Sequence, residues 1–401
     1  MTTSCRPKHR FFIFFSIVII SCTYSNTKTE NTSVKNRILP YRINIEKNIK
    51  NVKSIPLSFI GKKIEYVALE TTPRSLLKSI MGIQFSEKYI FVSDFDRLLQ
   101  FDRHGKFIRQ VGDNGRGPGE YIHVSGFWID EKNEKAYVMA WGIKTIKEYD
   151  FNGNFIKSFK IAFSSLQFIK TGNNSYTFVI PNAPFDTDSE FRLIVTDSAG
   201  TEILKIKNYN RVYNKPPLIA TKIPMYYFND TIRINESRVD TLNSFINGRH
   251  IPYAIFNFGI NKMDLDLSIS VEPTARGELN NQFMDKLWIW TISENNAFLF
   301  LKFNIGISDS SAYGVYNKEN SETAFLKKGF EDDLGIGIPF WPKYVYHDSL
   351  LVDHQDAYKI IDAINRPLKE IDDTKSSQSF KELYKLQETS NPVLILLNSD
   401  K

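Results

Sequence analysis

Cysteine and methionine are scarce in this 401-residue chain, which has 2 cysteines and 6 methionines. Both cysteines, Cys5 and Cys22, stand near the N-terminus, so the rest of the chain can form neither a disulfide nor a cysteine-ligated metal site. Long apolar runs are also missing: Phe11 to Ile20 has ten residues, too few to cross a bilayer as a mature helix. Because Gly-x-Ser-x-Gly and His-Glu-x-x-His motifs are absent, a nucleophilic mechanism has no support in the sequence.

Clusters of basic residues are missing as well, because acidic and basic residues alternate along the chain. The formal net charge is +6, and three of these charges come from Arg6, Lys8 and Arg10. The first 21 residues contain no acid, so the chain without them carries +3. Nucleic-acid binding requires clustered Lys and Arg, and this class of function is therefore excluded.

The N-terminus is typical of an export signal, because a basic start from Arg6 to Arg10 precedes the apolar segment and a small Ser21. The following Cys22 completes a pattern that resembles the bacterial lipobox. The resemblance implies cleavage after residue 21 and a diacylglyceryl group on the sulfur of Cys22; the alternative is an ordinary secretory signal with an incidental cysteine. Residues 22–54 are polar and predict a tether. The absence of an acidic run after Cys22 favours the periplasmic side of the outer membrane.

Aromatic residues make up 14% of the chain, with 31 Phe and 19 Tyr, and favour β-structure. The segment QFDRHGKFI (100–108) recurs as EYDFNGNFI (148–156) and more faintly as VTDSAGTEI (195–203). Each copy predicts a hairpin in which Asp-x-x-Gly forms the turn. A period near 48 residues built from short strands predicts an all-β propeller, because a β-sandwich gives no reason for such self-similarity.

Segments near both ends of the predicted propeller indicate further helices and strands. Ser379 to Glu382 fits a capping box, and with Phe380 and Leu383 on one face it predicts a short helix. The apolar run 392–397 has the length of a strand. We expect this run, or the segment 64–70, to complete a blade that contains the other end of the chain, since a propeller must close its ring.

These motifs, together with YVALETT (66–72), YIFVSD (89–94) and DNGRGPGEY (113–121), resemble the bacterial six-bladed β-propeller lipoproteins, an NHL-like family of largely unknown function. The resemblance covers residues 55–401 and implies six four-stranded blades. It assigns no catalytic residues, so none are carried over.

The glycine-rich segment 112–121 invites comparison with a phosphate-binding loop. A Walker loop requires Gly-Lys-Ser/Thr, whereas Pro118 and Glu120 occupy those places. The segment predicts a tight crossover between blades, with Tyr121 packing back. The alternative is a ligand-facing loop that presents Arg116, Glu120 and Tyr121.

Two other groups are candidates for ligand contacts. Asp94 and Asp96 could line a calcium site, although such residues are more often turn caps. Trp288 and Trp290 point the same way from one predicted strand and could form a platform for sugar rings; the alternative is a place in the core between blades.

Taken together, these features favour a non-enzymatic, lipid-anchored envelope propeller that binds a glycan, a peptide or a protein partner, with no cofactor. The alternative is a carbohydrate or lactone hydrolase or lyase that uses a divalent ion bound in the propeller channel and acidic side chains such as Asp94 or Asp96. The ligand and the oligomeric state stay open, since one fold hosts both binding and catalysis.

Overall fold

The structure is a computed structural model. It describes Met1 and residues 39–140, 144–165, 167–172, 174–181, 190–209, 224–236, 239–263, 284–306, 310–366 and 378–399. The chain divides into two units, Met1–Arg37 and Ile38–Lys401, and every described helix and strand belongs to the second. The predicted signal segment and Cys22 lie outside the described residues. Among those residues, we find no helix with the length and apolar character needed to cross a membrane.

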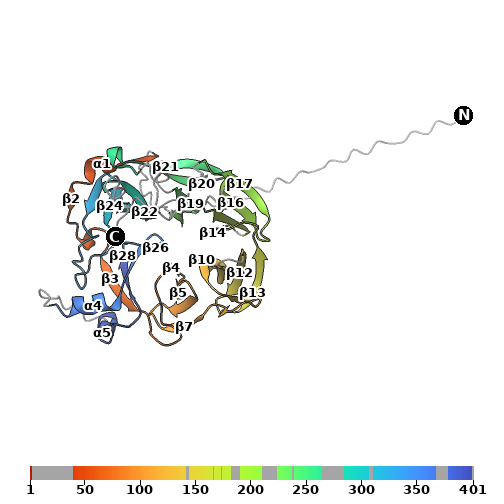
Figure 1. Cartoon of the computed structure of the whole chain (residues 1–401), viewed down its shortest axis with the longest axis horizontal. Coiled ribbons are helices and arrows are strands. Elements are labelled where there is room, and N and C mark those ends of the chain that lie inside the picture. Colours follow the sequence, from red (N-terminus) through yellow and green to blue (C-terminus); the bar gives the residue numbers. More distant parts are fainter. Residues whose placement is uncertain are drawn as a thin grey trace, which may run out of the picture. The chain divides into compact units, whose positions relative to one another are not determined.

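Six sheets form the blades of a propeller, which confirms the predicted fold (Figure 1). Blades 1 to 3 follow one another in the chain and consist of β4 (Gly82–Phe85), β5 (Tyr89–Ser93), β6 (Leu98–Asp102) and β7 (Phe107–Gln110); β10 (Val124–Asp130), β11 (Lys135–Ala140), β12 (Thr145–Asp150) and β13 (Phe155–Lys160); and β14 (Gln167–Thr171), β15 (Ser175–Val179), β16 (Phe191–Asp197) and β17 (Glu202–Lys207). The first strand of each blade lies innermost, and β26, β4, β10, β14 and β18 neighbour one another in that order.

Blades 4 and 5 lie in the part of the chain where the 48-residue repeat is no longer visible. They consist of β18 (Met225–Phe228), β19 (Thr231–Asn235), β20 (Thr241–Ile246) and β21 (Arg249–Asn257), and of β22 (Leu287–Glu294), β23 (Phe298–Ile305), β24 (Ser311–Asn317) and β25 (Thr323–Leu326). Short 3₁₀ turns accompany the blades at η1 (Leu57–Phe59), η2 (Glu131–Asn133) and η4 (Gly259–Asn261).

Blade 6 joins the two ends of the chain, as predicted. It contains β26 (Tyr344–Tyr346), β27 (Leu350–Gln355) and β28 (Val393–Asn398), with β3 (Lys63–Ala68) as its outer strand. In the antiparallel register of β28 and β3, Ile395 lies opposite Tyr66. The ring is therefore closed by backbone hydrogen bonds between the first and last thirds of the sequence.

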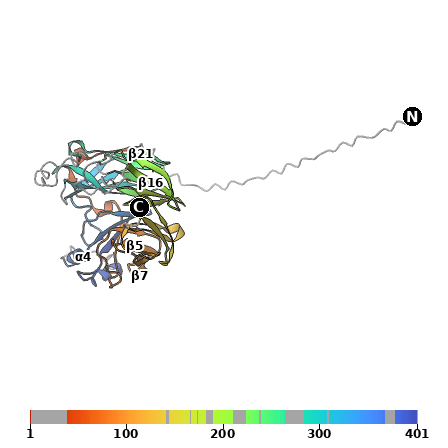
Figure 2. The ribbon, with the colours of Figure 1, turned by 45° about the vertical axis from the view of Figure 1, so that its right-hand side comes forward.

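Two helices interrupt blade 6 between β27 and β28 and lie at its periphery (Figure 1, Figure 2). The predicted short helix is α5 (Gln378–Leu383), whose Phe380 and Leu383 are buried. Phe380 packs edge-on against Tyr66 of β3 at 5.9 Å. The other helix, α4 (Ala357–Ile364), was not predicted; it buries Ile360 and Ala363 in the same cluster.

Part of the predicted tether belongs to the propeller instead. β1 (Tyr41–Asn44) pairs in parallel with β21, the short helix α1 (Ile45–Asn48) follows, and β2 (Val52–Lys53) pairs in parallel with β25. Tyr41, Ile43 and Ile45 are buried in the cluster between blades 4 and 5. These three apolar side chains stand at alternating positions among polar residues, and their burial explains why the polar composition of the segment was misleading.

The repeated Asp-x-x-Gly sequence forms the turn between the third and fourth strands of blades 1 to 3. In blade 1, Asp102 Oδ1 accepts hydrogen bonds from the backbone N–H groups of His104 and Lys106, both at 2.9 Å. Gly105 has φ +88° and lies against Ala68, at the end of the outer strand of the preceding blade. A Cβ atom at residue 105 would lie 2.3 Å from the Ala68 carbonyl oxygen, so glycine is required both by the turn and by its neighbour.

A buried ionic cluster joins blades 4 and 5. Glu294 of β22 pairs with Lys318 at 2.5 Å and with Arg233 Nε at 3.3 Å. The hydroxyl groups of Tyr226 and Tyr253 donate to the same carboxylate at 3.0 and 2.9 Å. Burial next to Glu294 raises the pKa of both tyrosines, which therefore keep the protons that they donate to this carboxylate.

Candidate functional site

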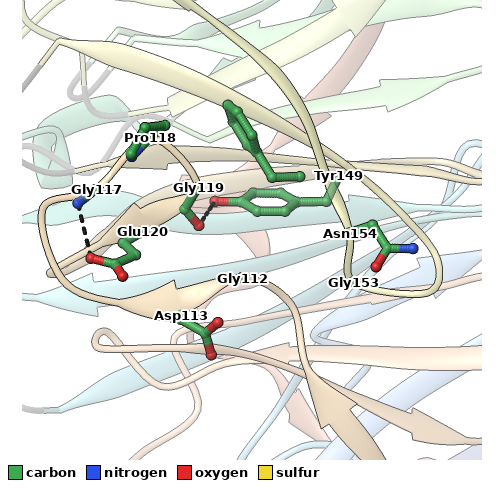
Figure 3. A pocket seen from close by; sticks show the side chains of 10 residues that line it. Gly112, Asp113, Gly117, Pro118, Gly119, Glu120, Tyr149, Gly153 and Asn154 are labelled. Atoms are coloured by element: carbon green, nitrogen blue, oxygen red, sulfur yellow. Dashed lines mark hydrogen bonds between the residues drawn. The ribbon is translucent and has the colours of Figure 1, made fainter.

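The crossover from β7 to β10 carries the glycine-rich segment, and a pocket of about 370 Å³ opens beside it (Figure 3). Gly112, Asp113, Gly117, Pro118, Gly119 and Glu120 line one side of the pocket. Tyr149, from β12, and Gly153, Asn154 and Phe155, from the turn into β13 of blade 2, line the other. The pocket thus lies where the crossover meets the next blade.

The crossover is held in shape by its own polar groups. β8 (Asp113–Asn114) and β9 (Glu120–Tyr121) pair in parallel, and Asp113 lies opposite Glu120 in this register. Glu120 Oε2 accepts a hydrogen bond from the Gly117 N–H at 2.9 Å (Figure 3). A Cβ atom at residue 115 would lie 2.0 Å from the same oxygen, so a larger residue there would displace the Glu120 carboxylate from this position.

Two side chains of β12, in blade 2, hold the crossover in place by hydrogen bonds. Lys147 Nζ donates to the carbonyl oxygens of Pro118 at 2.6 Å and Gly117 at 3.3 Å. Tyr149 donates its hydroxyl proton to the Gly119 carbonyl at 3.1 Å (Figure 3). Burial lowers the pKa of Lys147, and the charge of Glu120 opposes that effect. Three consecutive carbonyls are thereby turned toward blade 2.

The walls of the pocket combine carboxylates with an aromatic surface. The Asp113 and Asn154 side chains are exposed, and Asn154 Nδ2 donates to Asp150, which leaves its carbonyl oxygen as an acceptor. Phe155 packs at 65° against Tyr149 with ring centroids 5.9 Å apart, yet 37% of its surface is exposed. The arrangement offers acceptors for hydroxyl or N–H groups beside an apolar ring face.

The structure separates the three predicted residues of this loop. Glu120 lines the pocket, whereas Arg116 is exposed and forms no ion pair with Glu120, whose carboxylate binds the Gly117 N–H. Tyr121 is fully buried; it donates to Val111 O at 2.5 Å and accepts from Leu98 N at 3.1 Å. Tyr121 therefore packs back as predicted, and the idea that it faces a ligand is wrong.

A family model described as a domain of unknown function, DUF4934, matches residues 40–398. The chain belongs to the DUF4934 family. A solved structure of a "Putative exported protein" from Bacteroides fragilis is 18% identical and superimposes with a TM-score of 0.69, over 90% of this chain and 99% of that one. A DUF4221 family member from Bacteroides vulgatus is 10% identical with a TM-score of 0.51, over 84% and 96%. These likenesses show the shared fold. No curated protein matches the sequence.

Asp94 and Asp96 of this DUF4934 chain flank Phe95 in the turn between β5 and β6, and each already holds a cation. Asp94 is buried and pairs with Arg97 at 2.6 Å, and its Oδ1 accepts from the Arg97 backbone N–H at 2.9 Å. Asp96 accepts from Lys78 and, at 2.8 Å, from His123 Nδ1. Asp94 thus serves as the turn cap named as the alternative. Within the described ranges, no three His, Cys, Asp or Glu side chains gather as a metal site would require.

Trp288 and Trp290 do not form a flat platform. Trp288 is buried and donates from Nε1 to the Gly306 carbonyl at 3.2 Å. The two indole rings stand at 84° with centroids 5.3 Å apart, and the strand register shifts between Ile289 and Thr291. This β-bulge removes the strict alternation on which the shared orientation depended.

Sequence analysis missed Phe155, Asn154 and Lys147 as parts of the site. Phe155 and Asn154 lie in the second copy of the repeat, where they were interpreted only as turn and strand. Nothing in the linear sequence joins them to the glycine-rich crossover, because blade packing brings the two together.

Proposed function

We propose that this propeller is an exported binding protein whose pocket at the glycine-rich crossover holds a sugar residue of a glycan. The observation that carries the proposal is the combination, in one open pocket of about 370 Å³, of two carboxylates, an amide and an exposed phenyl ring. This volume falls within the roughly 300–1,000 Å³ of small-molecule sites.

The chemistry of the lining suits a neutral sugar. Ionised carboxylates accept hydrogen bonds only, so Asp113 and Glu120 would take protons from hydroxyl groups, and hydrogen bonds to charged groups contribute about 1.5–3 kcal/mol each. The Phe155 ring would receive the C–H face of the sugar, an apolar contact that is favoured because it removes both surfaces from water. A sugar ring has both hydroxyl groups and an apolar face, so it would use the carboxylates and the phenyl ring together.

Export and anchoring form the second part of the proposal. The basic start, the apolar segment and Cys22 support cleavage and lipid attachment, and the Bacteroides fragilis structure named "Putative exported protein" has the same fold. Two acyl chains on Cys22 would hold the propeller at the outer membrane, since stable attachment takes more than one chain. Palmitate labelling that is lost in Cys22→Ala tests this part alone.

The binding proposal is tested by a screen of glycans followed by calorimetric titration of the best ligand. We expect saturable binding that weakens at least tenfold in Phe155→Ala and in Asp113→Asn. Tyr384→Ala and Asp285→Asn, exposed residues elsewhere, serve as matched controls and should leave Kd unchanged. Unchanged affinity in both pocket variants would contradict the proposal. Cleavage of the bound glycan, detected by mass spectrometry, would favour the hydrolase alternative.

A further inference from the structure

A second group of side chains, which we call the Phe95 cluster, consists of Lys78, Phe95, Asp96 and His123. It lies at the ends where inner strands β4 and β10 begin, because Met81 N donates to Ser93 O at 2.8 Å and Val124 N to Phe95 O at 2.6 Å. None of its members lines the pocket of the proposed function.

The backbone of Phe95 is unusual for an aromatic residue. Its φ is +76°, in the left-handed region that costs a non-glycine residue about 1–3 kcal/mol. The side chain also presents part of its surface to solvent, since 39% of Phe95 is exposed. A residue that is strained and exposed at once is a candidate for function, since glycine or asparagine would serve the turn better.

The ring of Phe95 stacks on the imidazole of His123, with centroids 4.7 Å apart and planes at 27°. His123 Nδ1 lies 2.8 Å from Asp96 Oδ1. A hydrogen bond from Lys78 lowers the pKa of Asp96, so this carboxylate is ionised and can only accept. The proton of this bond therefore belongs to Nδ1, and Nε2 forms no hydrogen bond with any residue that the structure describes.

Lys78 is the charged side chain that the cluster exposes most to solvent. The side chain of Lys78 is 73% exposed, whereas that of Asp96 is only 18% exposed. With Nδ1 directed at Asp96, Nε2 is the ring nitrogen of His123 that can meet a ligand, either the acidic proton of a protonated acid or, from an imidazolium ring, an anion. Leu76, Met81 and Ile122, all exposed, add apolar surface on the same segments.

We propose that the Phe95 cluster binds an organic anion, with a phosphate or carboxylate group held by Lys78 and His123 Nε2 and an apolar part against Phe95 and Met81. This site would prefer an amphipathic acid to inorganic phosphate. The stacked rings and the neighbouring apolar side chains add contacts that inorganic phosphate cannot make.

The test titrates phenyl phosphate, benzoate and inorganic phosphate into histidine-labelled protein and follows the His123 side-chain signals by NMR, assigned with His123→Gln. We expect saturable shifts with at least one aromatic acid, and at least tenfold weaker binding of inorganic phosphate. Whichever acid binds identifies the preferred anionic group. Failure of both aromatic acids to shift His123 would overturn the proposal.

Two variants locate the site. Lys78→Met and Phe95→Gly should each raise Kd at least tenfold. Two control variants match them. Lys88→Met removes another exposed lysine that forms an ion pair, with Glu134, and Glu134→Gly replaces another residue with positive φ, at +48°. The Kd of both controls should stay within twofold of wild type. Phe95→Gly also removes the ring that stacks on His123, so the melting temperature of each variant is measured to confirm that it is folded. Unchanged Kd in both site variants would overturn the proposal.

Discussion

Turn glycines of the blades provide a graded test of how the blades are held together. Gly105 and Gly200 belong to the Asp-x-x-Gly repeat, whereas Gly172 lies in the turn between β14 and β15. Gly105 and Gly172 both have positive φ, +88° and +58°, but differ in their surroundings. A Cβ atom at residue 105 would lie 2.3 Å from the Ala68 carbonyl oxygen of blade 6, whereas one at residue 172 meets nothing within 4 Å. Gly200 resembles Gly105, since its Cβ would lie 2.1 Å from Lys160 O.

These distances set the expected loss of stability on substitution by alanine. Gly172→Ala introduces only left-handed backbone strain, about 1–2 kcal/mol. Gly105→Ala and Gly200→Ala add the displacement of a backbone carbonyl in the preceding blade, and overpacking of this kind costs about 1–3 kcal/mol more. The unfolded-state gain from replacing glycine is common to all three variants and cancels in the comparison.

Urea denaturation followed by tryptophan fluorescence measures these free energies of unfolding. We expect the free energies of unfolding of Gly105→Ala and Gly200→Ala to be lower than that of Gly172→Ala by about 2 kcal/mol, the middle of the overpacking range. Gly153→Ala should fall between them, because its nearest contact is the flexible side chain of Arg109 at 3.2 Å. Equal losses in all four variants would refute the role assigned to contacts between blades.

Three further predictions concern buried and half-buried polar groups. Glu294→Gln should destabilise the protein by about 3–5 kcal/mol, because it leaves two buried cations without their anion, and the unfolding midpoint in urea measures the loss. Gln84→Leu should cost about 1–3 kcal/mol in the same assay, since the Gln84 amide joins β4 to Phe127 O and Ile129 N of β10 at 2.8 and 2.9 Å; no loss would contradict the bridge. Burial lowers the pKa of His354 from 6.5 to about 4, so the unfolded chain binds its proton first as the pH falls, and stability should decline between about pH 6.5 and 4. His354→Gln should reduce that slope, and an unchanged slope would show that other groups cause it.

The fold was predictable from the sequence because its repeat has a local cause. Asp102, Asp150 and Asp197 each cap a turn with backbone hydrogen bonds, and the paired glycine allows the preceding blade to approach. These requirements keep the motif visible in three blades. Blade 4 instead joins its third and fourth strands through Asn247 and Gly248, both with positive φ, a different turn that hides the period.

The N-terminal strand was not predictable, because its pairing partner lies more than 200 residues away. Tyr41 of β1 lies opposite Ala254 of β21, and three buried side chains among polar neighbours give too short a pattern for a strand. The same limit applies to the candidate site. Gly112 to Glu120 could be found from composition, but Phe155 joins them only through the packing of blade 2 on the crossover.

The Phe95 cluster illustrates a third limit. Asp96 was singled out for its charge, yet Lys78 and His123 complete its surroundings from two other segments. The positive φ of Phe95 has no signature in the sequence, because glycine or asparagine would be expected at such a position.

The measurement that tests the central claim most directly is a crystal structure of the protein with the best-binding oligosaccharide of the glycan screen. The account predicts one sugar ring against Phe155, with hydroxyl groups within hydrogen-bond distance of Asp113 and Glu120. An oligosaccharide bound elsewhere on the propeller, with this pocket empty, would contradict it.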